Sequence, residues 1–266
     1  MEVVMRRKRR TIGLQQITGI ILALIGVVFF CYPTAAARSG KVFLDERFTS
    51  LDGWQPLFFP KIEAHTAYEL TSINGVPALQ VVSNNSASAL VLNRPFNVYD
   101  FPVLAWRWRV SNVFKKGDSS RKDGDDYPIR LYVMFQYDPD KASFGQSVKY
   151  GMAKLLYGKY PPHSSLNYIW ANKQQKAAFI PNPYTSQAMM LPVDQGREKV
   201  GRWVEHRVDI VRDYRAAFGE APPAMASIAV MGDSDNTGES ATAYINYIKI
   251  YAREQNNDNS RSERDR

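Results

Sequence analysis

Apolar and polar side chains alternate along two segments in the middle of the chain. In residues 104–110, Leu104, Trp106, Trp108 and Val110 fall on one face of an extended strand, and Ala105, Arg107 and Arg109 fall on the other. Residues 129–137 repeat the pattern, with Ile129, Leu131, Val133, Phe135 and Tyr137 opposite Arg130, Tyr132, Met134 and Gln136. Because successive side chains of a strand point to opposite faces, the pattern predicts antiparallel strands with one buried face. Trp106 and Trp108 are therefore predicted core residues.

Six further segments have strand character. They cover residues 76–83, 87–93, 166–172, 203–211, 226–231 and 242–251, and connections rich in Gly, Pro, Asn and Asp separate them. Many short strands joined by such turns are typical of sandwiches, whereas units of a parallel sheet would alternate strands with helices. The sequence thus predicts an all-β fold, an antiparallel two-sheet sandwich of the jelly-roll kind, as one domain over residues 41–253.

One or two short helices are expected beside the strands. Phe144, Val148, Met152, Leu155 and Leu156 recur at helical spacing, and Gly158 with Pro161 and Pro162 ends that segment. A shorter helical turn is predicted over residues 213–218, closed by Gly219.

The first 37 residues have the order of a secretory signal. Five basic residues at positions 6–10 precede an apolar run over residues 17–32, and Ala35, Ala36 and Ala37 follow it. The run is shorter than the roughly 20 residues that span a bilayer but long for a signal core. Residues 1–37 are therefore predicted to engage the membrane, either as a signal peptide during export or as a retained N-terminal anchor of the inner membrane. Both alternatives place the domain outside the cytoplasm, in the periplasm.

Charge and cysteine content exclude several classes of function. The net charge is +8, but the first 37 residues contribute half of it, which leaves a mildly basic domain without a dense basic run. We therefore expect no nucleic-acid partner. Cys31, the only cysteine, lies in the apolar run, so a cleaved product would have neither disulfides nor thiolate chemistry. Residues 254–266 are almost wholly polar and are predicted to be a disordered tail.

Two acidic segments, residues 122–128 and 232–238, adjoin predicted strands and indicate one place where carboxylates gather. In the second, Asp233, Asp235 and Thr237 recur at alternate positions before Gly238, as oxygen ligands do at the start of a calcium loop. Position twelve of such a loop would be Tyr244 instead of the glutamate that an EF-hand needs, so the sequence excludes an EF-hand. A looser calcium site, completed by Asp125 or Asp126, stays open, and calcium is the one cofactor that the sequence suggests. The alternative is ordinary turn chemistry, with Asp126 and Arg130 paired as a structural ion pair.

Aromatic rings near these segments suggest a sugar ligand. Tyr132, Tyr168 and Trp170 could offer ring faces to a glycan, and asparagine side chains could orient its hydroxyl groups. The predicted ligand-binding residues are Asp125, Asp126, Arg130, Tyr132, Trp170, Asn172, Asp233, Asp235 and Asn236. They predict a non-catalytic carbohydrate-binding module of the bacterial envelope.

Two other functions stay open. A glycan-cleaving enzyme could use Asp126 with Asp233 or Asp235, because glycoside hydrolysis employs paired carboxylates. The chain has no Gly-x-Ser-x-Gly motif, and His65, His163 and His206 show no metal-ligand spacing. A purely structural envelope protein without a ligand site is the third possibility. The residues favour binding over catalysis and leave enzymatic activity undecided.

Several spaced motifs resemble one bacterial family. They are Phe48 with Gly53 and Trp54, residues 105–110, Gly124 to Asp126 leading to residues 130–133, residues 167–170, Asp213 and Tyr214 with Phe218 and Gly219, and residues 233–238. Together they are similar to the family catalogued as domain of unknown function 3047. The resemblance spans nearly the whole exported region and implies an exported β-sandwich akin to galactose-binding-like jelly rolls. It implies no catalytic residues.

Overall fold

The computed structural model describes residues 40–138 and 162–254, which belong to one compact unit. The predicted signal or anchor over residues 1–37 and the predicted helix over residues 144–156 lie outside the described residues. So does the tail from residue 255 onward. Within the described ranges, neither helical segment has the length and apolar character needed to cross a bilayer.

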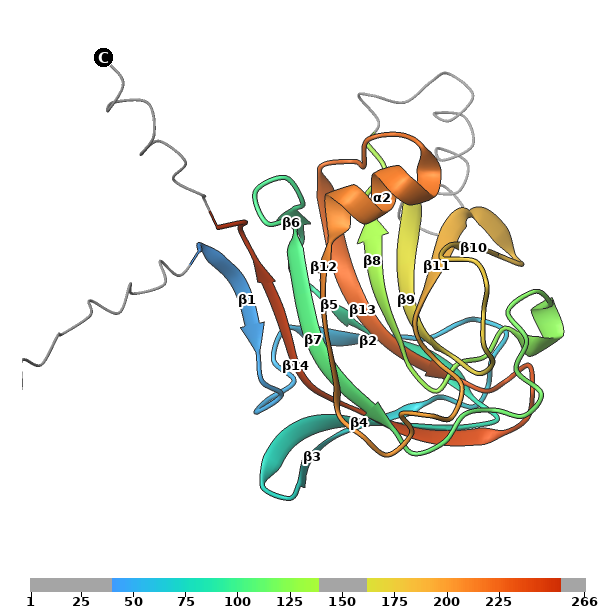
Figure 1. Cartoon of the computed structure of the whole chain (residues 1–266). Coiled ribbons are helices and arrows are strands. Elements are labelled where there is room, and N and C mark those ends of the chain that lie inside the picture. The colour runs from blue at the N-terminus through green and yellow to red at the C-terminus, as the bar shows by residue number, and fades with distance from the viewer. Residues whose placement is uncertain (1–39, 139–161, 255–266) are drawn as a thin grey trace, which may run out of the picture. The chain divides into compact units, whose positions relative to one another are not determined.

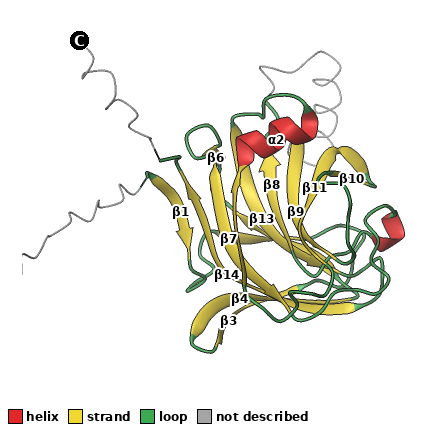
Figure 2. Ribbon diagram, in the orientation of Figure 1, coloured by secondary structure: helices red, strands yellow, loops and turns green. Residues whose placement is uncertain are grey.

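Two sheets and two small helical elements make up the described part (Figure 1 and Figure 2). The strands are β1 Val42–Glu46, β2 Trp54–Leu57, β3 Ala67–Ile73, β4 Val76–Asn84, β5 Ala87–Leu92, β6 Phe96–Asn97, β7 Val103–Val110, β8 Arg130–Phe135, β9 Ser164–Ala171, β10 Ile180–Asn182, β11 Thr185–Gln195, β12 Val204–Asp209, β13 Met225–Asp233 and β14 Ser240–Tyr251. The 3-10 helix η1 covers Lys122–Gly124, and the α-helix α2 covers Ile210–Phe218.

The sheets pack face to face as a sandwich. The six-stranded sheet has the order β12-β7-β14-β4-β3, with β1 paired to β14, and the eight-stranded sheet has the order β10-β11-β9-β8-β13-β5-β2, with β6 paired to β13. The core between them takes Trp106 and Trp108 from β7, Leu131 and Val133 from β8, and Ile248 from β14, all fully buried. The predicted all-β sandwich is therefore confirmed, and so are Trp106 and Trp108 as core residues.

The strand pairing departs from the prediction at one end of the eight-stranded sheet. All strand pairs are antiparallel in the described residues except β9 with β11, which run parallel from Ala188 opposite Ser165 to Gln195 opposite Ala171. β11 was not predicted, because Pro192 and the residues around Met189 do not alternate between apolar and polar side chains. The prediction also missed β1, β2, β3, β6 and β10.

The segment after residue 203 is only partly a strand. β12 ends at Asp209, whose carboxylate accepts a hydrogen bond from the Arg212 backbone N–H at 2.9 Å and so caps α2. α2 ends at Gly219, whose φ of 75° is the left-handed conformation of a helix C-cap. The predicted strand over residues 203–211 is therefore wrong at its end, and the helix starts earlier than the predicted turn.

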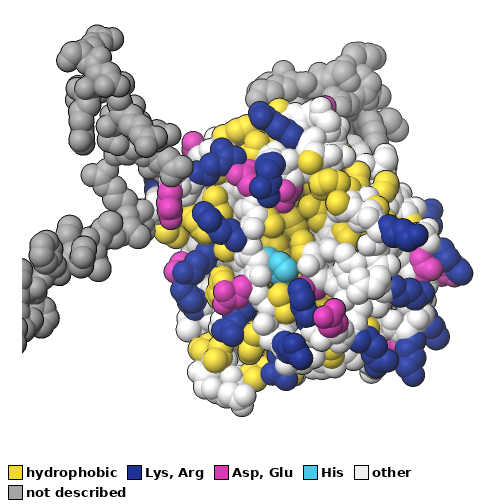
Figure 3. Space-filling model, viewed as in Figure 1, with side chains coloured by type: hydrophobic (Ala, Val, Ile, Leu, Met, Phe, Trp, Pro, Cys, Tyr) yellow, Lys and Arg dark blue, Asp and Glu magenta, His cyan; other side chains and the backbone are white. Residues whose placement is uncertain are grey.

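Charged side chains are mixed on the surface. On the face that Figure 3 presents, Lys and Arg side chains are interspersed with Asp and Glu. This mixture is the ordinary pattern of a solvated protein surface.

Candidate functional site

The two acidic segments meet where β8 begins and β13 ends. These strands are antiparallel neighbours, and Met231 of β13 lies opposite Arg130 of β8. One carboxylate oxygen from each of Asp126, Asp233 and Asp235 lies within 4.8 Å of the other two. The predicted convergence of the two acidic segments at one rim of the sandwich is confirmed.

Glycine makes this junction possible. A Cβ atom at Gly232 would lie 2.8 Å from Cγ1 of Val81 and 3.0 Å from the Pro128 carbonyl oxygen, so no larger residue fits there without movement. The Gly232 carbonyl accepts a hydrogen bond from Thr66 Oγ1 at 2.7 Å, which fixes the end of β13. Asp233, the last residue of β13, therefore lies directly beside the first acidic segment.

Arg130 is the centre of a buried ionic cluster. Its Nε donates to Asp233 Oδ1 at 2.9 Å, its Nη2 donates to Asp233 Oδ2, and its Nη1 lies 3.4 Å from Asp125 Oδ2. Its guanidinium also lies 4.4 Å from the ring centre of Tyr127. Arg130 and Asp233 are each 2% exposed, and charges buried this deeply must be paired.

Asp126 has a different partner from the predicted one. Its Oδ1 accepts from the Asn236 side-chain amide at 2.9 Å, and its Oδ2 accepts from the Thr237 backbone N–H at 2.6 Å. Asp126 is fully buried and holds the second acidic segment against the first. The predicted ion pair between Asp126 and Arg130 is therefore wrong, because Asp125 and Asp233 occupy the guanidinium.

The cluster contains more negative than positive charge. Four carboxylates, those of Asp125, Asp126, Asp233 and Asp235, gather here with one guanidinium, which contacts Asp125 and Asp233. Burial raises the pKa of the Asp233 carboxyl to about 7, Arg130 opposes the rise, and Asp126 and Asp125 add to it. Burial and the neighbouring Asp126 also raise the pKa of Asp235. A proton or another positively charged group is therefore favoured at this rim.

A hollow of about 380 Å³ opens beside the cluster on the outer face of the eight-stranded sheet. Its lining combines rings and apolar side chains with the charged rim: Phe59, Ile62, Ala87, Asp125, Arg130, Tyr132, Asn182, Tyr184, Met231, Asp233, Asp235 and Asn236. We call it the aromatic hollow. Tyr184 is 54% exposed, and its hydroxyl lies 2.8 Å from Asn236 Oδ1, which links the turn after β10 to the second acidic segment.

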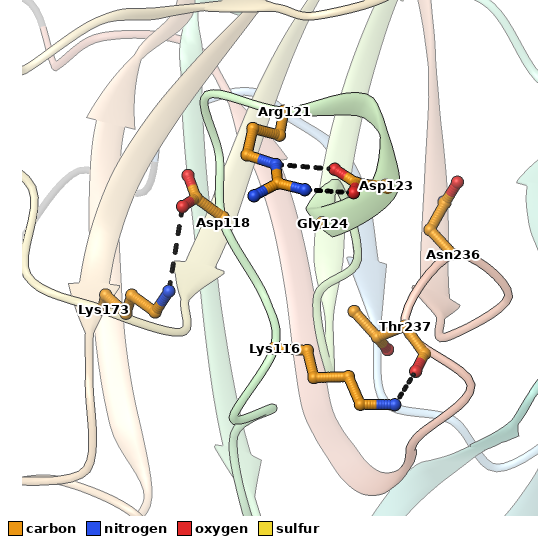
Figure 4. A pocket seen from close by; sticks show the side chains of 8 residues that line it. All are labelled: Lys116, Asp118, Arg121, Asp123, Gly124, Lys173, Asn236 and Thr237. Carbon is orange, nitrogen blue, oxygen red and sulfur yellow. Dashed lines mark hydrogen bonds and ion pairs between the residues drawn. The ribbon is translucent and has the colours of Figure 1, made fainter.

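A second, wholly polar hollow adjoins the first (Figure 4). It shares Asn236 with the aromatic hollow and carries three cations, of which Lys116 donates to the Thr237 carbonyl at 2.9 Å. Arg121 pairs with Asp123, and Lys173 lies 3.8 Å from Asp118. Each of these exposed charges thus has a local partner, and the hollow has no ring face for a ligand.

Three predicted ligand-binding residues, Asp126, Trp170 and Asn172, do not line the aromatic hollow, and Asp126 is fully buried as described above. Trp170 is fully buried in the core, and its indole N–H donates to the Gly196 carbonyl at 3.1 Å. Asn172 accepts from the Phe114 N–H at 2.8 Å and donates to the Asp126 carbonyl at 2.6 Å, so it ties two loops together. Tyr168 is likewise buried, with its hydroxyl 3.1 Å from Asp213. The predictions of a sugar-facing Trp170 and a ligand-orienting Asn172 are corrected to structural roles.

The carboxylates fit a calcium ion poorly in this arrangement. Arg130 bonds both oxygens of Asp233, and backbone and amide N–H groups bond both oxygens of Asp126. The Thr237 hydroxyl accepts from the Glu239 N–H at 3.4 Å, and the Thr237 backbone N–H donates to Asp126. Of the predicted ligands, Asp235 alone is half-buried, and its carboxylate has no hydrogen-bond or ion-pair partner in another residue within residues 40–138 and 162–254.

The sequence analysis missed four residues of the aromatic hollow. Phe59 and Ile62 come from the connection between β2 and β3, and Asn182 and Tyr184 come from the turn between β10 and β11. Asn182 donates to Asp125 Oδ2 at 2.9 Å. The sequence Asn182-Pro183-Tyr184 is a turn signal that could have indicated an exposed ring.

Comparisons with known proteins gave a family match and weak similarities to solved structures. No curated protein matches the chain. The chain is similar to the family 11 carbohydrate-binding module of the cellulosomal cellulase Lic26A-Cel5E of Clostridium thermocellum, with 9% identity, a TM-score of 0.41, and coverage of 82% of this chain and 97% of that one. It is also similar to a lectin from Bauhinia forficata in complex with GalNAc, with 14% identity, a TM-score of 0.35, and coverage of 80% and 99%.

The motifs that resembled one family are confirmed by a match over most of the domain. The model of the family described as protein of unknown function (DUF3047) matches residues 52–249. The chain therefore belongs to that family.

Proposed function

We propose that this chain is a carbohydrate-binding β-sandwich that takes its ligand in the aromatic hollow. The observation that carries the proposal is the combination of an exposed ring, Tyr184, and the half-buried Phe59 ring with two asparagines that neighbouring residues already hold in place. Tyr184 and Phe59 offer ring surface, and Asn182, Asn236 and Asp235 offer amide and carboxylate groups for hydroxyls. A concave site with rings and a few fixed polar groups suits a polyhydroxylated ring.

The two asparagines of the hollow are preorganised. Asp126 holds the Asn236 side chain, Asp125 holds Asn182, and Arg130 holds Asp125. The groups that contact a ligand therefore need little ordering when it arrives, which lowers the entropic cost of binding. On this proposal, the buried ions support the site, while the half-buried and exposed residues contact the glycan.

The same geometry favours binding over cleavage. Hydrolysis of a glycoside needs one carboxylic acid and one carboxylate on either side of the scissile bond. Asp126 is fully buried and Asp233 is 2% exposed with its oxygens bonded by Arg130, so neither can approach a substrate while the rim keeps this arrangement. Asp235 then remains as a single half-buried carboxylate among the candidates.

We further propose that the domain works outside the cytoplasm. The order of basic, apolar and small residues over positions 1–37 supports export, either with cleavage after Ala37 or with retention as an anchor. An exported domain would meet envelope or environmental glycans. Fractionation of cells that express the tagged full chain tests this proposal: recovery in the cytosol would contradict it.

A glycan array followed by calorimetry tests the binding proposal. We expect a glycan that binds the full chain, and we expect Tyr184→Ala to weaken it at least tenfold, because the variant removes an exposed ring from the hollow. Tyr99→Ala is the matched control, since Tyr99 is a 45% exposed tyrosine outside the hollow. Equal affinities of the two variants would contradict the site, and release of reducing sugar would support an enzyme instead.

A further inference from the structure

The outer face of the six-stranded sheet has a second hollow, on the side of the sandwich opposite the aromatic hollow. Its volume is about 420 Å³, and it is lined by Arg47, Ala105, Glu205, His206, Arg207, Tyr247, Lys249 and Tyr251. The residues come from the neighbouring strands β12, β7 and β14 and from the segment after β1 (Figure 1). We call it the cationic hollow.

The floor of the cationic hollow is Ala105. Arg207 on β12 and Lys249 on β14 both lie opposite Ala105 in the strand register, one on each side. Neighbouring strands are about 4.8 Å apart, so the Cα atoms of Arg207 and Lys249 are separated by roughly 10 Å across the small alanine. Two long cationic side chains therefore flank the small side chain of Ala105, one on each side.

Tyrosine rings support the two cations. The Arg207 guanidinium lies 5.7 Å from the ring centre of Tyr251, and Lys249 Nζ lies 5.8 Å from that of Tyr247. Arg47 lies 5.4 Å from the same Tyr247 ring. Cation–π contacts of this kind hold charged groups over a surface without neutralising them.

Positive charge is in excess here, and it is local. Four cations, Arg47, Arg107, Arg207 and Lys249, are accompanied by two carboxylates: Glu205 lies 3.6 Å from Arg107, and Asp45 contacts Arg47 and Lys249. Arg207 has no carboxylate at ion-pair distance within residues 40–138 and 162–254. The charge left without a partner is thus at the edge of the gap over Ala105.

We propose that the cationic hollow binds a carboxylate-bearing sugar of an acidic polysaccharide. Arg207 and Lys249 would hold the carboxylate over Ala105, because a guanidinium pairs with carboxylate oxygens through two parallel N–H groups. Glu205 and the Tyr247 and Tyr251 hydroxyls would bond the neighbouring sugar hydroxyls. An anionic membrane is a worse partner, since its continuous negative surface would also face Asp45 and Glu205, whereas a single acidic sugar contacts the gap alone.

This site is independent of the aromatic hollow. It lies on the other sheet, carries the opposite charge and shares no residue with it. A chain with both sites could bind two glycans of different charge at once. The failure of either proposal would leave the other unchanged.

Titration calorimetry at low ionic strength tests the proposal, with polygalacturonate and its fully methyl-esterified form as probes. The two polymers share one backbone and differ in the methyl ester, which removes the carboxylate charge. We expect the full chain to bind the acid form, to ignore the ester, and to lose affinity as salt is added. No binding of polygalacturonate, equal binding of the ester, or binding of phosphatidylglycerol vesicles in place of polygalacturonate would overturn the proposal.

Variants locate the binding. We expect the double variant Arg207→Gln and Lys249→Gln to bind polygalacturonate at least tenfold more weakly. The control double variant Lys176→Gln and Arg202→Gln makes the same change in net charge at exposed residues outside the hollow and should bind as the parent does. Ala105→Leu keeps every charge and fills the gap, so it should also abolish binding while thermal unfolding stays cooperative. Equal loss in the two double variants would overturn the proposal.

Discussion

Arg130 and Asp233 form a buried ion pair that joins two strands from distant parts of the chain. Arg130 is the first residue of β8 and Asp233 is the last residue of β13, and Nε of the one donates to Oδ1 of the other at 2.9 Å. Neither side chain is more than 3% exposed. The pair fixes the rim on which both acidic segments converge.

Removal of Arg130 alone should destabilise the fold strongly. We expect Arg130→Met to lower the free energy of unfolding by about 3–5 kcal/mol, because Asp233 and Asp125 would remain buried without their cation. Urea denaturation at about pH 8, where Asp233 is ionised in the folded chain, measures this change through tryptophan fluorescence.

The double variant Arg130→Met with Asp233→Leu distinguishes the contribution of the ion pair to the free energy of unfolding from that of side-chain packing. We expect it to be more stable than Arg130→Met alone, since no unpaired Asp233 charge remains. Asp123→Asn, which breaks the exposed pair with Arg121, is the control and should cost less than about 1 kcal/mol. Strict additivity of the two buried substitutions would show that Arg130 and Asp233 do not act as a pair.

Local alternation was sufficient to predict the sandwich but not the lining of the site. β7 and β8 follow the period of two that their residues show, because each has one face in the core. β9 is buried along its whole length, so Trp170 carries no sequence signal that distinguishes core from site. Trp170 packs into the main core, while Ile169 and Ala171 belong to a separate buried cluster with Tyr127 and Met190. The covering of both faces is a property of the tertiary fold and leaves no mark within β9 itself.

The position of the acidic rim could be predicted from the sequence, but the hydrogen-bond and ion-pair partners of its carboxylates could not. Turn residues identified Asp126 and Asp233, and strand pairing brought them together as expected. The carboxylate that pairs with Arg130 is set by the end of β13, where Gly232 allows Asp233 to lie close to the start of β8. Asn182 and Tyr184 join the site from a turn more than 50 residues beyond Arg130 in the sequence, and no local pattern connects them to it.

Stability should fall as the pH rises through neutrality. Burial holds the pKa of Asp233 near 7 in the folded chain, whereas an unfolded aspartate titrates near about 3.9. Between these values the folded state keeps a proton that the unfolded state has lost. The contribution is therefore complete below about pH 4 and is lost as the pH rises through about 7.

Urea denaturation at several pH values measures this dependence. We expect the free energy of unfolding to decrease by about 2 kcal/mol from about pH 5.5 to about pH 7.5. Asp233→Asn should remove that slope even though it also lowers the overall stability, while Asp123→Asn should keep it. An unchanged slope in Asp233→Asn would assign the pH dependence to other groups.

Calcium should have only a small effect on stability. The oxygens of Asp126 and Asp233 are already bonded, so an ion would have to displace Arg130 or the amides of the second acidic segment. We expect about 1 mM calcium to change the melting temperature no more than the same concentration of magnesium does. A calcium-specific rise that Asp235→Asn abolishes would instead establish a metal site at the rim.

Trp170 should affect stability and leave ligand affinity unchanged. Trp170→Phe keeps a ring in the core but loses the hydrogen bond to the Gly196 carbonyl and some packing volume. We expect a loss of about 1–3 kcal/mol in the free energy of unfolding. Affinity for an array-identified glycan, measured well below the melting temperature, should stay within about twofold; a larger loss would return Trp170 to the site.

Two asparagines test which residues stabilise the fold and which contact the glycan. Asn172→Ala removes a buried side chain that bonds the Phe114 N–H and the Asp126 carbonyl, so we expect it to cost about 2 kcal/mol of stability. Asn182→Ala changes a half-buried residue that lines the aromatic hollow, so we expect a smaller stability loss and a weaker affinity for the glycan. Unfolding and calorimetry on both variants check this division. If Asn172→Ala weakened binding more than Asn182→Ala at equal folded fraction, the ligand would lie nearer the loop around Phe114 than the aromatic hollow.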